Sequence, residues 1–78
     1  MVDHAEMKYI IFEKDGLEVP VVFPDTIYHE QVKMNGKVVS AGMCKIKHGK
    51  FEVWGKSISL LKESRLEDEL ILNQLTKK

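Results

Sequence analysis

Residues 37–54 constrain the fold most strongly. On either side of His48-Gly49, the residues that a hairpin would set opposite each other are chemically compatible. Glycine adopts positive φ freely and histidine tolerates it, so this dipeptide suits the two-residue turn of a β-hairpin. The register set by the turn produces four favourable cross-strand pairs: Ile46 with Phe51, Lys45 with Glu52, Cys44 with Val53, and Met43 with Trp54. The segment therefore predicts an antiparallel hairpin with Cys44 on its core-facing side.

A second hairpin is predicted over residues 8–23, where apolar runs flank Asp15-Gly16. A two-residue loop pairs Phe12 with Val19 and Ile10 with Val21, and places these four on one face with Leu17 and Phe23. The same register sets Glu13 opposite Glu18, so a four-residue loop of equal parity remains an alternative. Pro20 has no N–H for a ladder, which places its strand at an edge of the sheet.

The segment that follows, residues 25–34, allows two interpretations. Asp25 or Thr26 can cap a short helix over about 26–32. Asn35-Gly36 can instead turn a small hairpin whose incoming strand is 31–34. Farther along, residues 57–61 can continue the sheet as a last strand.

The C-terminal stretch SRLEDELILNQLTKK predicts a helix. Ser64 and Glu67 have the spacing of a capping box, and the acidic run 67–69 suits the positive end of the helix dipole. An apolar stripe is expected to face the sheet, formed by Leu66, Leu70 and Leu75 with Ile71 or Leu72 to the side.

These elements predict a single α+β domain over residues 1–78, with residues 1–6 and 77–78 frayed. We expect a small antiparallel sheet of four to five strands, built from the two hairpins, with the C-terminal amphipathic helix packed on one face and one short helix if 26–32 is helical. A chain of 78 residues buries only about 60–65% of its unfolded surface. A deep, enclosed substrate cavity is therefore not expected.

Composition and charge narrow the class of protein further. The single cysteine excludes an internal disulfide framework and a cysteine-rich zinc site, and points to a reducing compartment. No basic region followed by a long apolar run is present, so we expect a cytoplasmic location and no membrane association. The net charge of zero conceals a −4 block in residues 1–28 and a +4 block in residues 29–56.

Candidate catalytic, cofactor and metal sites find little support in the residue spacing. On one strand face, residues two apart are separated by about 7 Å and residues four apart by about 13 Å, so Cys44 and His48 are too far apart for a catalytic pair. The three histidines have no metal-ligand spacing and are expected to be exposed: His4, His29 and His48. The glycines match no nucleotide-binding loop. The sequence therefore predicts no catalytic, cofactor or metal site, and no enzyme.

The outward face of the hairpin at 37–56 is the predicted partner-binding surface, because it sets a tryptophan beside a strip of lysines. Its residues are Lys45, Lys47, Lys50 and Trp54, with Lys37 and Lys56 at the base. Alternatively, the C-terminal helix covers Trp54 and Met43. Val39 and Ala41 continue the apolar pattern on this face, which indicates that one end is covered and the lysine end is open.

Three stretches, VPVVFPDTIYHEQV, VVSAGMCKI and SISLLKESRLEDELIL, resemble a pattern found in small uncharacterised proteins of bacteriophages and prophages, over residues 8–72. The resemblance implies an accessory protein that binds a host or phage macromolecule in the host cytoplasm. We expect a protein partner, with nucleic-acid binding by the basic hairpin 37–56 as the alternative. Little besides Pro20 and the lysines protects the strand edges, so a homodimer through an unpaired edge is also allowed.

Overall fold

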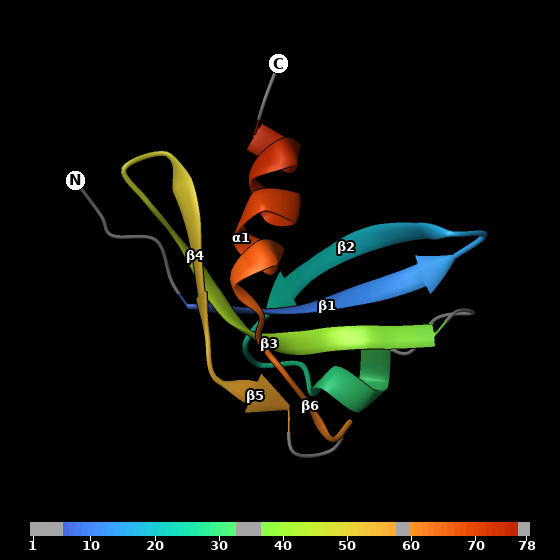
Figure 1. Cartoon of the computed structure of the whole chain (residues 1–78). Coiled ribbons are helices and arrows are strands. Elements are labelled where there is room, and N and C mark those ends of the chain that lie inside the picture. The colour runs from blue at the N-terminus through green and yellow to red at the C-terminus, as the bar shows by residue number, and fades with distance from the viewer. Residues whose placement is uncertain (1–5, 33–36, 58–59, 77–78) are drawn as a thin grey trace.

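The computed structural model describes residues 6–32, 37–57 and 60–76. It contains a four-stranded antiparallel sheet in the order β2-β1-β3-β4, a two-stranded sheet and a C-terminal α-helix (Figure 1). The strands are β1 (Met7–Lys14), β2 (Leu17–Pro24), β3 (Lys37–Lys47), β4 (Lys50–Trp54), β5 (Lys56–Ser57) and β6 (Lys62–Glu63). The helices are α1 (Leu66–Asn73) and two 3-10 helices, η1 (His29–Val32) and η2 (Gln74–Thr76). The predicted α+β domain is confirmed; the fraying expected at 1–6 and 77–78 concerns, apart from Glu6, residues outside the described part.

Both hairpins have the predicted two-residue turns. Asp15 and Gly16 have φ of 54° and 80°, and His48 and Gly49 have 54° and 79°, the positive values that a type I′ turn requires. The four pairs predicted for the β3–β4 hairpin are all present, as are Phe12 with Val19 and Ile10 with Val21. Glu13 does lie opposite Glu18. The repulsion is relieved from outside the hairpin, because Arg65 Nη2 lies 2.9 Å from the Glu18 carboxylate.

Strand β2 lies at an edge of the sheet, as predicted from Pro20, and prolines protect this edge. In a hairpin with a two-residue loop, the residues flanking the loop form a hydrogen-bonded pair, so alternate residues direct their N–H groups away from the partner strand. In β2 these outward positions are Glu18, Pro20, Val22 and Pro24. Two of the four are prolines without an N–H, so this edge is a poor template for a further strand.

Two side chains of α1 protect the opposite edge. The N–H of Phe51 donates to Asn73 Oδ1 at 2.7 Å, and the N–H of Val53 donates to Glu69 Oε2 at 3.1 Å. Asn73 and Glu69 are four residues apart, so they lie on one side of the helix. No spacing in the sequence indicates this protection, which makes strand pairing at either edge less favourable than expected.

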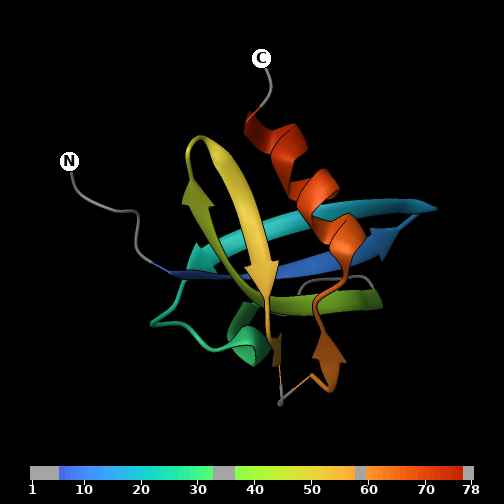
Figure 2. The same cartoon turned by 60° about the vertical axis from the view of Figure 1, so that its left-hand side comes forward.

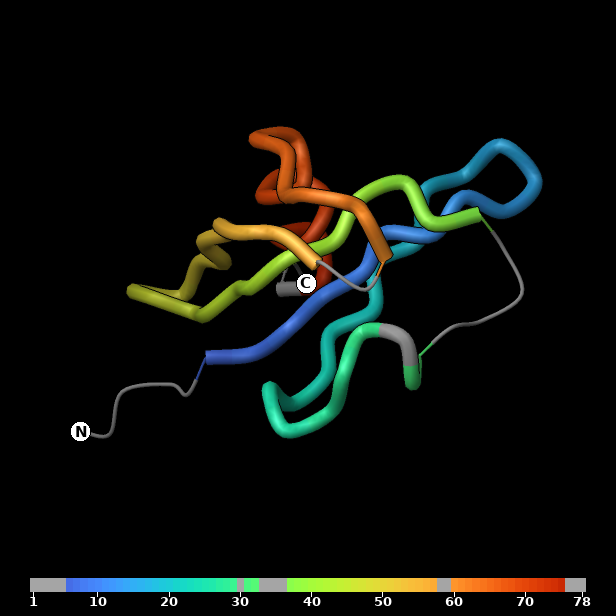
Figure 3. The backbone as a smooth tube through the Cα atoms, turned by 90° about the horizontal axis from the view of Figure 1, so that it is seen from below, coloured from blue at the N-terminus to red at the C-terminus, as the bar shows by residue number. Residues whose placement is uncertain are grey.

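The two faces of the sheet carry separate apolar clusters, which we call the helix face and the η1 face. The helix-face cluster, under α1, consists of Tyr9, Ile11, Cys44, Phe51 and Leu72. The η1-face cluster consists of Ile10, Phe12, Phe23 and Ala41, against which Ile27, Val32 and Leu60 pack. Figure 3 shows α1 and the η1 segment on opposite sides of the strands. Strand β1 is therefore buried on both faces along its centre.

Three predicted core positions on the η1 face differ from expectation. Leu17 and Val19 point to this face but remain 69% and 45% exposed, because the residues that pack over the cluster do not reach the far end of the hairpin. Val39 was predicted to share the face of Met43. The β1–β3 register shifts between Ile11 and Phe12, and beyond this bulge Val39 packs with the helix-face cluster instead.

The segment after β2 is a turn followed by a 3-10 helix. Helix η1 begins at His29, later than the helix predicted over 26–32, and residues 31 and 32 are helical rather than the start of a strand. The alternative turn at Asn35-Gly36 lies outside the described residues. His29 is buried, contrary to its predicted exposure: its Nε2 lies 3.0 Å from Gly42 O, and its ring packs edge-on against Phe23. Because a carbonyl only accepts, Nε2 must carry the proton.

The chain between the main sheet and α1 forms the small second sheet, at the end of the molecule away from the C-terminus (Figure 2). Of the last strand predicted at 57–61, only Ser57 is in a strand; Leu60 and Leu61 form a turn, and 58–59 lie outside the described residues. Gly42 allows this chain to pass close to β3, since a Cβ at this position would lie 2.7 Å from the carbonyl oxygen of Trp54.

Helix α1 is placed as predicted but turned differently. Its N-cap is Arg65 rather than Ser64. The backbone N–H of Arg65 donates to Asp68 Oδ2 at 3.0 Å, so Asp68 rather than Glu67 is the acidic residue of the capping box. The stripe expected to face the sheet is the exposed side: Leu66, Leu70 and Leu75 are 88%, 71% and 55% exposed. Asp68 and Leu72 are buried in its place.

A single buried carboxylate explains this orientation. Asp68 accepts hydrogen bonds from the Tyr9 hydroxyl, from the Ser40 hydroxyl at 3.0 Å and from the Arg65 guanidinium at 2.9 Å. Burial is the main cause that raises the pKa of the Tyr9 hydroxyl, and the hydrogen bond to Asp68 raises it further. A buried charge is tolerated only when it is paired and hydrogen-bonded. The Tyr9 and Ser40 hydroxyls are available on the helix face of β1 and β3, so α1 turns Asp68 inward and the leucines outward.

Candidate functional site

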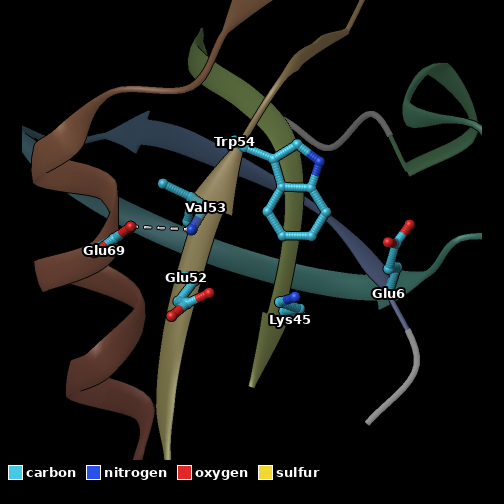
Figure 4. A pocket seen from close by; sticks show the side chains of 6 residues that line it. All are labelled: Glu6, Lys45, Glu52, Val53, Trp54 and Glu69. Carbon is cyan, nitrogen blue, oxygen red and sulfur yellow. Dashed lines mark hydrogen bonds between the residues drawn. The ribbon is translucent and has the colours of Figure 1, made fainter. Parts of the chain in front are cut away.

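Trp54 lies on the η1 face, opposite the face that α1 covers. Its side chain is half-buried, and Figure 4 shows the indole directed away from the helix, on the side where Lys45 and Glu6 lie. The Lys45 ammonium lies 5.7 Å from the centroid of the indole ring, within the range of a cation–π interaction. The alternative in which the C-terminal helix covers Trp54 and Met43 is therefore wrong.

The structure brings together four of the six predicted partner-binding residues. Lys47 and Lys50 face each other at the exposed tip of the β3–β4 hairpin, on the same face as Lys45 and Trp54. Lys37 is at the opposite end of β3, paired across the sheet with Glu13. Lys56 belongs to β5 and pairs with Glu63. Lys37 and Lys56 therefore do not form the base of one continuous basic strip.

A hollow of about 460 Å³ opens beside Trp54, and its chemistry is mixed. It is lined by Glu6, Lys45, Glu52, Val53, Trp54 and Glu69 (Figure 4). Glu52 pairs with Lys45 across the strands, and the Glu69 carboxylate is bonded to the Val53 N–H. The immediate surroundings of the indole thus contain carboxylates as well as a lysine. The predicted pairing of Lys45 with Glu52 is present, and at the hairpin tip Lys47 pairs with another lysine, Lys50.

A second aromatic residue joins this face from a different part of the chain. Tyr28, 66% exposed, precedes η1, and the Lys8 ammonium lies 5.0 Å from the centroid of its ring. Lys8 pairs with Met43, and Met43 pairs with Trp54, so these three side chains form a row across β1, β3 and β4. No spacing in the sequence links Tyr28 or Lys8 to Trp54, because only the tertiary fold brings them to one face.

We call the open end of the η1 face the aromatic–lysine surface. Its members are Glu6, Lys8, Tyr28, Met43, Lys45, Lys47, Lys50, Glu52 and Trp54. Four lysines stand against two glutamates, a formal charge of +2 in a chain whose net charge is zero, and Glu69, which lines the hollow from α1, lowers the local charge to +1.

The predicted burial of Cys44 is confirmed. Its side chain is fully buried in the helix-face cluster, and burial raises the pKa of the thiol to about 12. His48 is exposed at the hairpin tip. A thiol with this pKa is almost entirely protonated at neutral pH, and only the thiolate acts as a nucleophile or metal ligand.

The buried imidazole of His29 is explained by packing. Burial lowers the pKa of His29, which keeps its imidazole neutral against Gly42 O. Among residues 6–32, 37–57 and 60–76, no group of three or more histidine, cysteine or acidic side chains is placed to hold a metal ion. His4 lies outside these residues.

The exposed leucines of α1 form a second surface, which we call the leucine pair. Leu66 and Leu70 are four residues apart and so lie on one side of the helix. Leu75 lies beyond the end of α1, in the 3-10 helix η2, and is not part of this pair. The exposed charged residue next to Leu66 in the helix is acidic, Glu67.

No protein-family model, curated protein or solved structure matches this chain. Within the part of the chain that the structure describes, no helix is long and apolar enough to span a bilayer.

Proposed function

We propose that this chain is a non-enzymatic interaction module that binds a partner protein through the leucine pair of α1. The observation that carries the proposal is the outward orientation of Leu66 and Leu70, at 88% and 71% exposed. The resemblance to phage and prophage proteins makes a host or phage protein of the cytoplasm the expected partner.

The orientation of α1 makes these two leucines a candidate contact. An amphipathic helix normally turns its apolar stripe toward the core. Here the contacts of Asp68 with Tyr9 and Ser40 hold the opposite side of the helix against the sheet. Large apolar side chains four residues apart are the anchors that a helix uses when it docks in a groove of another protein.

The charges beside the leucine pair specify the partner more closely. Glu67 directly follows Leu66 and has a 64% exposed side chain, at 3.5 Å from Arg65 Nη1. Complementary potentials favour encounter and exclude wrong partners. We therefore expect an apolar groove on the partner, bordered by lysine or arginine.

The chemistry of the other candidate groups supports a binding role over catalysis. The Cys44 thiol is buried with a pKa of about 12, and the Tyr9–Asp68–Ser40 network is filled by bonds within the chain. These groups are engaged in holding the fold together. A general acid or nucleophile must instead be able to reach a substrate.

Affinity capture from the host cell, with two matched double variants, tests the proposal. Leu66→Ser/Leu70→Ser removes the leucine pair. Leu17→Ser/Val19→Ser is the control, because it removes exposed apolar side chains near the turn of the β1–β2 hairpin. We expect the first variant to lose a partner that the wild type and the second variant retain. Thermal unfolding should show that each variant remains folded. Retention of the same partner by folded Leu66→Ser/Leu70→Ser would remove the leucine pair from the proposal.

A further inference from the structure

We propose that the aromatic–lysine surface binds single-stranded nucleic acid. The proposal is independent of the leucine pair, because the two surfaces lie on different sides of the sheet. It differs from nucleic-acid binding by the hairpin 37–56 alone, since Lys8 and Tyr28 supply one of its two aromatic–lysine pairs.

The surface repeats one arrangement twice: an aromatic ring with a lysine ammonium over it. Lys8 lies 5.0 Å from the centroid of Tyr28, and Lys45 lies 5.7 Å from that of Trp54. Proteins that bind single strands without sequence preference combine aromatic platforms for the bases with cations that follow the phosphates. Each ring here has a cation beside it.

The strand order separates the two platforms. Lys8 is on β1 and Trp54 is on β4, with Met43 of β3 between them. Neighbouring strands are about 4.8 Å apart, so Lys8 and Trp54 are separated by about 10 Å. Tyr28 lies on the Lys8 side of this row, so one base cannot stack on both rings. A strand that runs across the row would contact each ring with a different base.

A single strand fits better than a duplex. In a duplex the faces of the bases are stacked on each other and are not available to aromatic side chains. The described elements also present no basic helix for a major groove: the first turn of α1 is acidic, and this helix lies on the other face.

The charges set the expected strength of binding. Lys8, Lys45, Lys47 and Lys50 attract phosphates, whereas Glu6 and Glu52 repel them. Each phosphate neutralised on a single strand contributes about −0.7 to the slope of log K against log salt. Four lysines therefore predict a slope of between about −2 and −3. Removing the two glutamates should tighten binding.

Titration with oligo-dT and oligo-rU tests the proposal. Trp54 is the only tryptophan of the chain, so quenching of its emission reports stacking on the wild-type protein. For variants, anisotropy of a labelled oligonucleotide replaces this signal. Trp54→Ala and Tyr28→Ala should each weaken binding by about 5- to 150-fold. Glu6→Gln/Glu52→Gln should strengthen it.

A matched pair of lysine variants separates the site from general charge. Lys45→Gln/Lys47→Gln should weaken binding and flatten the salt slope by about 1.4. Lys14→Gln/Lys62→Gln removes the same amount of charge from positions outside the aromatic–lysine surface. This variant should leave the affinity and the salt slope nearly unchanged. Circular dichroism confirms that each variant is folded.

Three results would each overturn the proposal. One is the absence of binding to either oligonucleotide at low ionic strength. Another is equal affinity for duplex and single strand. The third is displacement of oligo-dT by poly-glutamate at equal charge concentration, which would indicate a surface for acidic proteins. Because none of these measurements involves the leucine pair, they leave the proposed protein interaction untouched.

Discussion

The helix face and the η1 face of the sheet are closed by different physical means. The helix face is held by a buried charge, Asp68, with hydrogen-bond partners on three segments of the chain. The η1 face is held by apolar packing under a short 3-10 helix, with one buried imidazole bonded to Gly42 O. Hydrogen bonds to a buried charge have strict geometry, whereas apolar contacts are non-directional.

This difference accounts for what each face leaves at the surface. The fixed orientation of α1 forces Leu66 and Leu70 outward. Helix η1 spans only four residues and covers only part of its face, so Trp54 and Tyr28 remain accessible. The helix face therefore presents leucines to solvent because the hydrogen bonds of Asp68 fix the orientation of its covering helix. The η1 face presents aromatic and basic side chains because helix η1 covers only part of it.

The largest expected effect is on the helix face, at Asp68. Asp68→Ala leaves the Tyr9 hydroxyl, the Ser40 hydroxyl and the Arg65 guanidinium without their shared acceptor. Breaking a buried ionic network by removing one partner costs about 3–5 kcal/mol of unfolding free energy. Urea unfolding followed by circular dichroism measures the loss.

Glu67→Ala is the matched control for this carboxylate. Its side chain is 64% exposed and lies 3.5 Å from Arg65 Nη1, an ion pair of the weak surface class. We expect a change within about 0.5 kcal/mol. Similar losses for the two variants would show that Asp68 does not hold the helix face.

The next effect distinguishes the two sides of α1. Leu72 is fully buried, so Leu72→Ala should cost about 2–5 kcal/mol in transfer free energy and cavity formation. Leu70→Ala removes the same atoms from a side chain that is 71% exposed and should cost less than about 0.5 kcal/mol. The two midpoints in urea give the comparison directly. A large loss at Leu70 would mean that the stripe faces the sheet after all.

The sequence predicted the hairpins well because their determinants are local. Asp15-Gly16 and His48-Gly49 need positive φ, and a fixed loop length then sets every pair along the strands. Neither the bulge at Val39 nor the closure of the β4 edge by Asn73 is encoded locally. Both depend on segments that meet only in the folded chain.

The facing of α1 could not be predicted for the same reason. Within the helix, Leu66 and Leu70 define the apolar side, and Asp68 resembles an ordinary first-turn acid. Its hydroxyl partners, Tyr9 and Ser40, are 59 and 28 residues away along the chain. Tyr28 joined the aromatic–lysine surface equally without a local signal, whereas Lys45, Lys47, Lys50 and Trp54 share one hairpin and could be grouped from the sequence.

A smaller effect, dependent on pH, probes the η1 face. Burial holds the pKa of His29 below its usual value of 6.5, and Lys8 adds to this shift. Below pH 6.5 the unfolded chain binds a proton that the folded protein does not. The stability contributed by neutral His29 is therefore complete above this pH and is lost as the pH falls below it, at up to about 1.4 kcal/mol per pH unit.

Unfolding measured between pH 7.5 and 5 checks this expectation, with His29→Gln as the test variant. A glutamine amide can still donate to Gly42 O but does not titrate. The slope in this window should be smaller for His29→Gln than for the wild type. His48→Asn is the control for the loss of an exposed histidine. Equal slopes for His29→Gln and the wild type would show that His29 does not link protonation to the closure of the η1 face.

The smallest expected effect concerns the His48-Gly49 turn, which joins β3 and β4 at the edge of both faces. His48 has a φ of 54°, a value that asparagine adopts at lower cost, and Asn-Gly is the preferred dipeptide of a type I′ turn. His48→Asn should therefore stabilise the fold by about 0.5 kcal/mol, seen as a higher midpoint in urea at an unchanged m-value. The side chain is exposed, so loss of packing does not oppose this gain. If His48→Asn is less stable than the wild type, His48 makes a contact at the tip that the turn geometry alone does not explain.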